Sequence, residues 1–139
     1  MKHYQATKLG RINGETCLIE LFPLPSRSQS DWHYPYHTNL PYLKTKPLFR
    51  QHFAPIRSQQ VRRRIEEYRP KYVTFASRDE LLMAQWEMIA QVPMREFRFE
   101  GRTVLIGEDH YTRFMVIPHP VSRGLTSAFF RDVGDSLVS

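Results

Sequence analysis

His119 is the residue best suited to chemistry in the segment FMVIPHPVSRGLTSAFF, residues 114–130. It stands between two prolines, directly after an apolar run. A neutral imidazole can donate a hydrogen bond to a carbonyl oxygen that gains charge, and Pro118 and Pro120 would fix the loop that aims it. The competing interpretation is a turn histidine whose polar atoms are satisfied by the backbone. Taken alone, the segment favours the turn.

The residues that follow His119 suit a phosphate group. Ser122 offers a hydroxyl, Arg123 a fork of N–H donors, and Gly124 a backbone amide near a predicted helix start. A solvated turn would have the same composition. Leu125 is an apolar side chain at the tip of this basic loop, of the kind that is inserted into a base stack as a wedge. Packing beneath the last helix would explain Leu125 equally well.

Two other polar groups favour a plain structural role. The densest positive run predicts a solvated helix face, because its members spread around the helix: Arg57, Arg62, Arg63, Arg64 and Arg69. The cluster Glu108-Asp109-His110 is typical of a polar turn between two strands.

The aromatic segment DWHYPYH, residues 31–37, has two functional interpretations. His33 and His37 have a spacing that could chelate a metal on a helix, but Pro35 disfavours that helix, so we predict no metal site. The rings of Trp32, Tyr34 and Tyr36 could stack on bases, or could instead clamp the loop to the body of the protein.

Charge and cysteine content narrow the function classes. Lysine and arginine outnumber the acidic residues by 20 to 14, which raises the expectation of a polyanionic partner. Cys17 is the single cysteine, so no internal disulfide can form and a reducing compartment is favoured. No segment approaches the roughly 18 consecutive apolar residues of a membrane span. We therefore expect a cytoplasmic protein with no membrane partner. We also expect no cofactor, because no phosphate-binding glycine loop or nucleophile elbow occurs.

The chain pattern predicts strands that alternate with helices. Six of the ten prolines fall between Pro23 and Pro55, and predict a long loop there. Around that loop we expect a buried strand at 17–22, a helix from about Ser58 to Pro70, and a strand at 72–77. Then follow a helix at about 79–90, paired strands around Gly101, a strand ending at 118 and a helix capped by Thr126.

This order predicts one α/β domain over residues 1–139, a three-layer sandwich with a mainly parallel central sheet of about four strands. In such a sheet, ligands bind in a crevice at the carboxyl ends of the strands. The loops after Phe22, Phe75 and Ile117 would share that edge, which places His119 at the predicted crevice.

Three segments resemble the uracil-DNA glycosylase superfamily over about residues 17–138: CLIELFPLPSRS, IEEYRPKYVTFAS and, above all, FMVIPHPVSRGLTSAFF. The last resembles the histidine-proline motif of the family, which precedes a loop that enters the minor groove of DNA. By that resemblance His119 is the catalytic histidine, which stabilises charge on the base, and Pro118 and Pro120 are its rigid setting. Leu125 belongs to the intercalating loop, with Ser122 and Arg123 on the phosphate side.

Two parts of the family pattern have no counterpart here. The glycine-rich motif that carries a water-positioning carboxylate would precede the first matching strand, and the base-reading asparagine is missing from CLIELF. The resemblance therefore implies a domain shortened at its N-terminus that binds DNA with weak or no base-excision activity. The alternatives are an active DNA glycosylase with Glu20 or Asp31 as a substitute carboxylate, and a protein-interaction module.

Overall fold

The computed structural model describes residues 3, 7–10, 14–28 and 30–138. The chain divides into two compact units, residues 1–53 and residues 54–139. Helix α2 (Lys46–Tyr68) runs through the boundary between them. The second unit contains the sheet, in the order of elements β1 (Tyr72–Ala76), α3 (Glu80–Ala90), β2 (Arg95–Phe99), β3 (Arg102–Glu108), β4 (Arg113–Ile117) and α4 (Ser127–Val138).

The first unit is organised around Phe49. This buried ring contacts Trp32 at 5.3 Å and Phe53 at 5.0 Å between ring centroids. The indole Nε1 of Trp32 donates to the carbonyl oxygen of Leu43, at the end of a 3-10 turn, Pro41–Leu43. A second 3-10 turn, Tyr34–Tyr36, forms the tip of the aromatic segment. Trp32 and Tyr34 thus hold this loop within the first unit, the latter through its hydroxyl, which donates to the Pro25 carbonyl, whereas Tyr36 is exposed.

Two sequence predictions in the first unit are wrong. Residues 17–22 form no strand, and the side chains of Leu18 and Ile19 are exposed by 69% and 45%. An apolar run becomes a buried strand only where a neighbouring strand pairs with it, and the four-stranded sheet is built without this segment.

The predicted long loop at 23–55 is also shorter than expected, because α2 begins at Lys46. Pro47 lies in the first turn of the helix, where the missing N–H has no intrahelical partner. Pro55 lies inside the helix and removes one backbone hydrogen bond, just past the boundary between the two units. Ser58 is consequently a buried residue within α2 and not the predicted start of a helix, and its hydroxyl donates to Oε1 of Gln85 at 2.8 Å.

The sheet has the strand order β1-β4-β3-β2. Strands β1 and β4 are parallel, whereas β3 is antiparallel to both β4 and β2. The predicted mainly parallel sheet is therefore wrong, and the sheet is mixed. The reason is local: two short connections, at 100–101 and 109–112, turn the chain directly back on itself, which only antiparallel neighbours allow.

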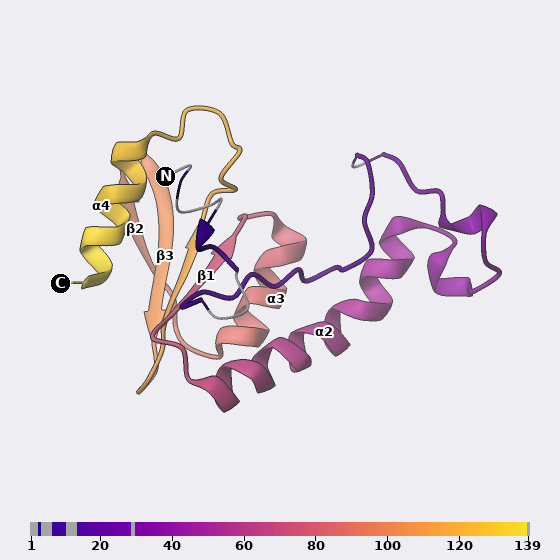
Figure 1. Cartoon of the computed structure of the whole chain (residues 1–139), viewed down its shortest axis with the longest axis horizontal. Helices are drawn as coiled ribbons and strands as arrows, with labels where there is room; N and C mark the ends of the chain where they lie inside the picture. Colours follow the sequence, from indigo (N-terminus) through magenta and orange to yellow (C-terminus); the bar gives the residue numbers. More distant parts are fainter. Residues whose placement is uncertain (1–2, 4–6, 11–13, 29, 139) are drawn as a thin grey trace. The chain divides into compact units, whose positions relative to one another are not determined.

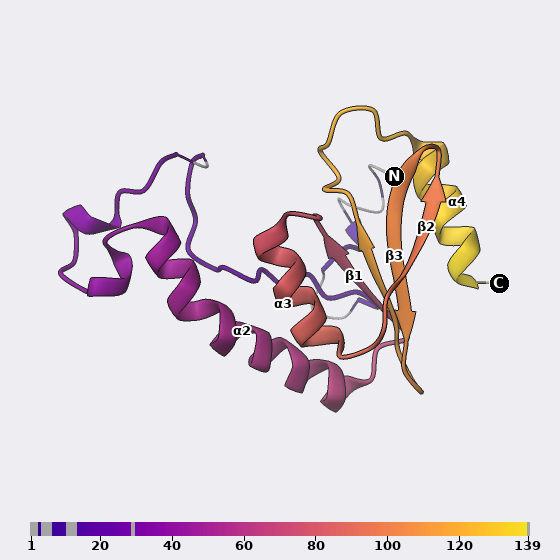
Figure 2. The same cartoon turned by 180° about the vertical axis from the view of Figure 1, so that it is seen from behind.

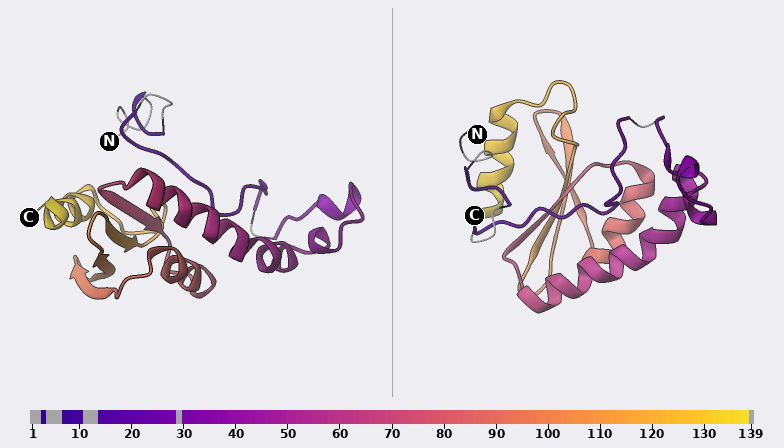
Figure 3. Two further views of the ribbon diagram at one scale, coloured as in Figure 1. Left: turned by 90° about the horizontal axis from the view of Figure 1, so that it is seen from below. Right: turned by 45° about the vertical axis from the view of Figure 1, so that its right-hand side comes forward.

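Different helices cover the two faces of the sheet (Figures 1 and 2). On one face, the Trp86 ring of α3 stacks on Phe75 of β1 at 4.8 Å, and Phe75 lies 6.3 Å from the Phe114 ring. On the other face, Phe129 and Val133 of α4 join a buried cluster with Val104, Met115 and Ile117. Because successive strand residues point to opposite faces, Phe114 and Met115 belong to different clusters. Figure 3 shows α3 and α4 on opposite sides of the sheet.

Local signals position the ends of these elements. Asp79 is the N-cap of α3 and accepts a hydrogen bond from the Leu81 amide at 3.0 Å, close to the predicted helix start at about residue 79. Thr126 accepts from the Phe129 amide at 3.0 Å, as a cap of α4 should. The β2–β3 turn has positive φ at both Glu100 and Gly101, which is the conformation that a two-residue hairpin requires.

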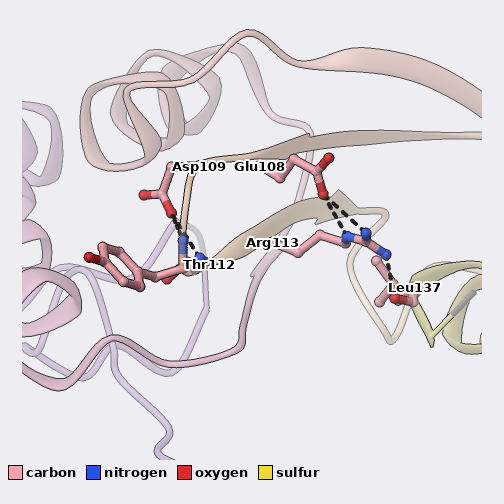
Figure 4. Close-up of polar contacts among 6 residues, drawn as sticks. Glu108, Asp109, Thr112, Arg113 and Leu137 are labelled. Atoms are coloured by element: carbon pink, nitrogen blue, oxygen red, sulfur yellow. Dashed lines mark hydrogen bonds and ion pairs between the residues drawn. The ribbon is translucent and has the colours of Figure 1, made fainter.

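The turn between β3 and β4 is held by Asp109 (Figure 4). Its Oδ1 accepts from the amides of Tyr111 and Thr112, each at 2.8 Å. Partial desolvation raises the pKa of the Asp109 carboxyl, but those two amides and the positive charges of Arg62 and His110 outweigh it and lower the pKa below its usual value. The neighbouring Glu108 pairs with Arg113 at 3.0 Å, and Arg113 also donates to the carbonyl of Leu137.

Asp109→Asn is expected to reduce stability at neutral pH and to lose this effect in acid. A carboxyl whose pKa is lowered on folding stabilises the fold above its unfolded pKa of about 3.9, and this contribution disappears as pH falls through the folded pKa. Urea midpoints of the wild type and the variant, measured from pH 7 to pH 3, should therefore converge towards the acid end. A constant gap across that range would show that the charge of Asp109 has no such role.

Candidate nucleic-acid interface

The carboxyl ends of β1 and β4 lie side by side. Ala76 and Ile117 are register partners, and the Ser77 amide donates to the Ile117 carbonyl at 3.0 Å. Two connections therefore start next to each other, one at 77–79 and the other at 118–126. No strand precedes Phe22 in the described residues around it, so the loop after Phe22 does not join this edge as predicted.

The helices that follow these two strands leave in different directions. The chain after β1 enters α3 on the Phe75 face, and the chain after β4 enters α4 on the Met115 face. Neighbouring parallel strands with this property define the point of an α/β sheet where ligands bind, because the connections diverge and leave the strand ends accessible. The structure thus places His119 beside the one parallel strand pair of the sheet.

His119 is exposed and lies in a backbone turn. Its carbonyl accepts from the Ser122 amide at 2.8 Å, and its Nδ1 accepts from the Val121 amide at 3.3 Å. An accepting Nδ1 implies that the proton of the neutral ring is on Nε2. Among the described residues, Nε2 makes no hydrogen bond, so this nitrogen presents a donor to solvent. The predicted turn is therefore present and uses one ring nitrogen, while the catalytic interpretation of His119 stays a prediction.

The rest of the loop is tied to the β2–β3 hairpin. Nη2 of Arg102 donates to the Arg123 carbonyl at 2.7 Å, and Thr126 Oγ1 donates to Glu100 Oε2 at 2.8 Å. Gly124 has φ +80°, and a Cβ at that position would lie 2.7 Å from Nη2 of Arg102. The backbone conformation therefore favours glycine, whereas the Arg102 guanidinium, at the end of a flexible exposed side chain, could move aside for a Cβ.

Arg123 and Leu125 lie in different environments within this loop. The guanidinium of Arg123 is exposed and makes no ion pair with any described residue. Leu125 is half-buried and packs against the cluster under α4, together with Phe99 and Phe130. Leu125 thus packs beneath the last helix, which is the second of the two roles predicted for it.

Ser77 is a feature of this edge that the sequence did not reveal. Its φ is +128°, a conformation that residues with a Cβ rarely adopt. The Trp86 indole donates to its carbonyl at 2.9 Å, and its Oγ accepts from the Asp79 amide at 3.2 Å. Strained backbone of this kind concentrates at functional sites, and here it stands directly after β1, where the Ser77 amide donates to the carbonyl of Ile117, two residues before His119.

No carboxylate is joined to His119 by a hydrogen bond or an ion pair within the described residues. Two carboxylates that follow strands at this end of the sheet have other partners. Asp79 caps α3, and Glu100 accepts a hydrogen bond from Thr126. Glu20 and Asp31, the two substitute carboxylates that the sequence suggested, belong to residues 1–53, whereas His119 belongs to the unit of residues 54–139.

The remaining sequence candidates lie elsewhere. Arg62 departs from the expected solvated face, because its guanidinium donates to the carbonyls of Ile89 and Ala90 at the end of α3, at 3.2 Å and 3.0 Å. A shallow hollow of about 280 Å³ lies beside it, between α2 and α3. The His33 and His37 rings are 6.0 Å apart, and the described residues contain no cluster of three or more metal-ligating side chains.

No family model matches this chain, and neither a curated protein nor a solved structure shows significant similarity to it. Across the described residues, no helix has the length and apolar character that a membrane crossing requires.

Proposed function

We propose that this protein is a nucleic-acid-binding domain of the uracil-DNA glycosylase type, which contacts DNA through residues 118–125. The observation that carries the proposal is that the connections with Ser77 and His119 both begin at the adjoining carboxyl ends of the parallel pair β1 and β4. The proposed architecture is a three-layer α/β sandwich with α3 and α4 as its outer layers. Their contacts with Phe75 on one face and Met115 on the other support this layering.

Positive charge at this edge supports a phosphate partner. The exposed side chains of Arg78 and Arg123 flank the two connections, and Arg102 extends from β3 to the Arg123 carbonyl. In protein–DNA complexes about half or more of the hydrogen bonds go to phosphate oxygens and sugars. Arginine guanidinium groups and serine hydroxyls are among the donors. In the proposed complex Arg123 and Ser122 contact the backbone of the nucleic acid.

Base excision is proposed to be weak or absent. In this proposal Nε2 of His119 donates a hydrogen bond to a base oxygen that gains charge. Hydrolysis of the glycosidic bond also needs a group that positions water or stabilises the sugar cation, and no described carboxylate contacts His119. The loss of one such group in an enzyme typically reduces the rate by about 100-fold or more.

Binding of fluorescein-labelled duplex and single-stranded DNA should weaken steeply as salt is raised. Each phosphate that the protein neutralises releases counterions and contributes a slope of about −0.9 to log K against log salt for duplex DNA. Arg123→Ala should weaken binding to all sequences about equally and should reduce the slope by about 1. Fluorescence anisotropy from about 50 to 200 mM salt measures both quantities.

Arg131→Ala is the matched control, because Arg131 is an exposed arginine on α4 outside the loop. It should leave the slope unchanged. A flat salt response in the wild type would refute nucleic-acid binding and favour a protein-interaction module. Incubation with uracil-containing single-stranded DNA tests base excision. Abundant abasic product that is lost in His119→Ala would show an active glycosylase and would contradict the proposal that base excision is weak or absent.

A further inference from the structure

A second surface that combines tyrosine rings and positive charges lies at the opposite end of the sheet. It comprises Tyr68, Arg69, Lys71, Tyr72 and Tyr111, and is called the tyrosine patch below. The rings of Tyr68, Tyr72 and Tyr111 are exposed by 67%, 38% and 55%. Tyrosine is amphipathic and is often partly exposed, but three exposed tyrosines on two adjoining segments, 68–72 and 111–113, each near a cation, need a common explanation.

Each ring of the tyrosine patch has a cation against it. The Arg69 guanidinium lies 4.3 Å from the ring centroid of Tyr111, and the Lys71 ammonium lies 5.4 Å from that of Tyr72. Arg64 lies 5.9 Å from the Tyr68 ring and is shared with Glu67 at 3.6 Å. Arg69 and Lys71 make no ion pair with any described residue, so their charges remain available to an anion.

The backbone beneath the tyrosine patch is tied down at several points. The Arg69 amide donates to the Ile65 carbonyl at 2.8 Å and ends α2 in a left-handed conformation. The Arg113 amide donates to the Lys71 carbonyl at 3.0 Å, and the Thr112 hydroxyl donates to the Pro70 carbonyl at 2.7 Å. Asp109 holds the turn that carries Tyr111 (Figure 4). A fixed backbone lowers the ordering cost that these rings would pay on binding a ligand.

The tyrosine patch is separate from the loop that carries His119. Tyr72 opens β1 and Tyr111 precedes β4, whereas the loop follows the last residues of the same two strands. A five-residue strand spans about 16 Å at roughly 3.3 Å per residue. The two surfaces therefore cannot contact the same nucleotide.

We propose that the tyrosine patch binds single-stranded nucleic acid, with bases stacked on the rings of Tyr68 and Tyr111 and phosphates next to Arg69 and Lys71. Single-strand binding proteins use this combination, because every base has a π-face and every linkage a phosphate. Carboxylates nearby offset much of the positive charge: Glu67 pairs with Arg64, and Glu108 with Arg113. Charge alone is therefore a weak attraction here, and the rings must supply part of the affinity.

Fluorescence anisotropy with a labelled oligothymidylate of about 12 nucleotides tests this proposal. Tyr111→Ala and Tyr68→Ala should each weaken binding by about 10-fold, because each removes one stacking platform, and should leave the salt slope unchanged. Tyr111→Phe keeps the aromatic ring and should therefore bind the oligothymidylate with wild-type affinity. Arg69→Ala should reduce the salt slope by about 0.7, the value for one phosphate contact on a single strand.

Three controls separate this proposal from others. Tyr36→Ala removes a tyrosine that is 86% exposed in the other unit, and should not change oligothymidylate affinity. Arg123→Ala should leave the effects of the patch variants intact even if the loop around His119 binds nothing. Wild-type affinity in Tyr68→Ala and Tyr111→Ala, or equal competition by polyglutamate, would overturn the proposal, since the first excludes stacking and the second would indicate a general polyanion site.

Discussion

Phe129→Ala is expected to lower the free energy of unfolding of the sheet unit by about 3 to 5 kcal/mol. The Phe129 ring is fully buried and joins α4 to the sheet through a cluster with Val104, Met115 and Ile117. Removal of the ring costs the transfer of its apolar surface and leaves a cavity, because the cluster is formed by strand residues that cannot collapse into the space. Since α4 follows the loop that carries His119, its detachment would also release that loop.

Urea denaturation measures this effect, with tryptophan fluorescence as the signal. The chain has two tryptophans, Trp32 in the first unit and Trp86 in α3. A Trp32→Phe background therefore makes the signal report the sheet unit. Phe97→Ala is the matched control, because Phe97 is 43% exposed on the edge strand β2 and should cost far less. Equal losses in the two variants would contradict the described core.

Gly107→Ala is expected to destabilise the sheet by about 1 to 3 kcal/mol, the range for overpacked sites, although it adds only one methyl group. Gly107 is buried in β3. A Cβ there would lie 2.6 Å from the Pro93 carbonyl oxygen and 2.9 Å from Cγ2 of Val92. A backbone oxygen cannot rotate out of the way, so the chain before β2 must shift.

Gly134→Ala provides the opposite expectation in the same chain. Gly134 lies in α4, and a Cβ there would meet no atom within 4 Å. Alanine is the better helix former by about 0.8 to 1.0 kcal/mol, so this variant should be more stable than the wild type. The same denaturation experiment compares the two variants. A neutral Gly107→Ala would show that the connection at 92–94 does not pack against β3 as described.

Local signals predicted the second half of the chain well. The Glu100-Gly101 turn, the end of α2 before Pro70 and the Thr126 cap are all present. Each depends on atoms within a few residues, such as a side chain that accepts from an amide or a turn that requires positive φ. Such signals act on the chain wherever it lies in the fold, and the sequence is therefore sufficient to predict them.

Predictions that depended on distant partners were less successful. CLIELF at 17–22 has the apolar character of a strand but no neighbouring strand pairs with it. Alternation of strands and helices suggested a mainly parallel sheet, whereas the sheet has one parallel pair and two antiparallel pairs. Proline density indicated a loop up to Pro55, although α2 tolerates Pro47 in its first turn and includes Pro55. Composition does not specify which strand pairs with which, or where in a helix a proline falls.

The sequence by itself determined the turn at His119, the N-cap of the last helix at Thr126 and the turn at Glu100-Gly101, since these depend on residues that are close in the sequence. Only the tertiary structure decided that Ser77 has a positive φ directly after β1 and that Leu125 packs beneath α4. Arg69 and Tyr111, which are far apart in the sequence, likewise lie against each other only in the folded chain, where β1 pairs with β4. The physical reason is that strand register, and not local propensity, brings distant residues together.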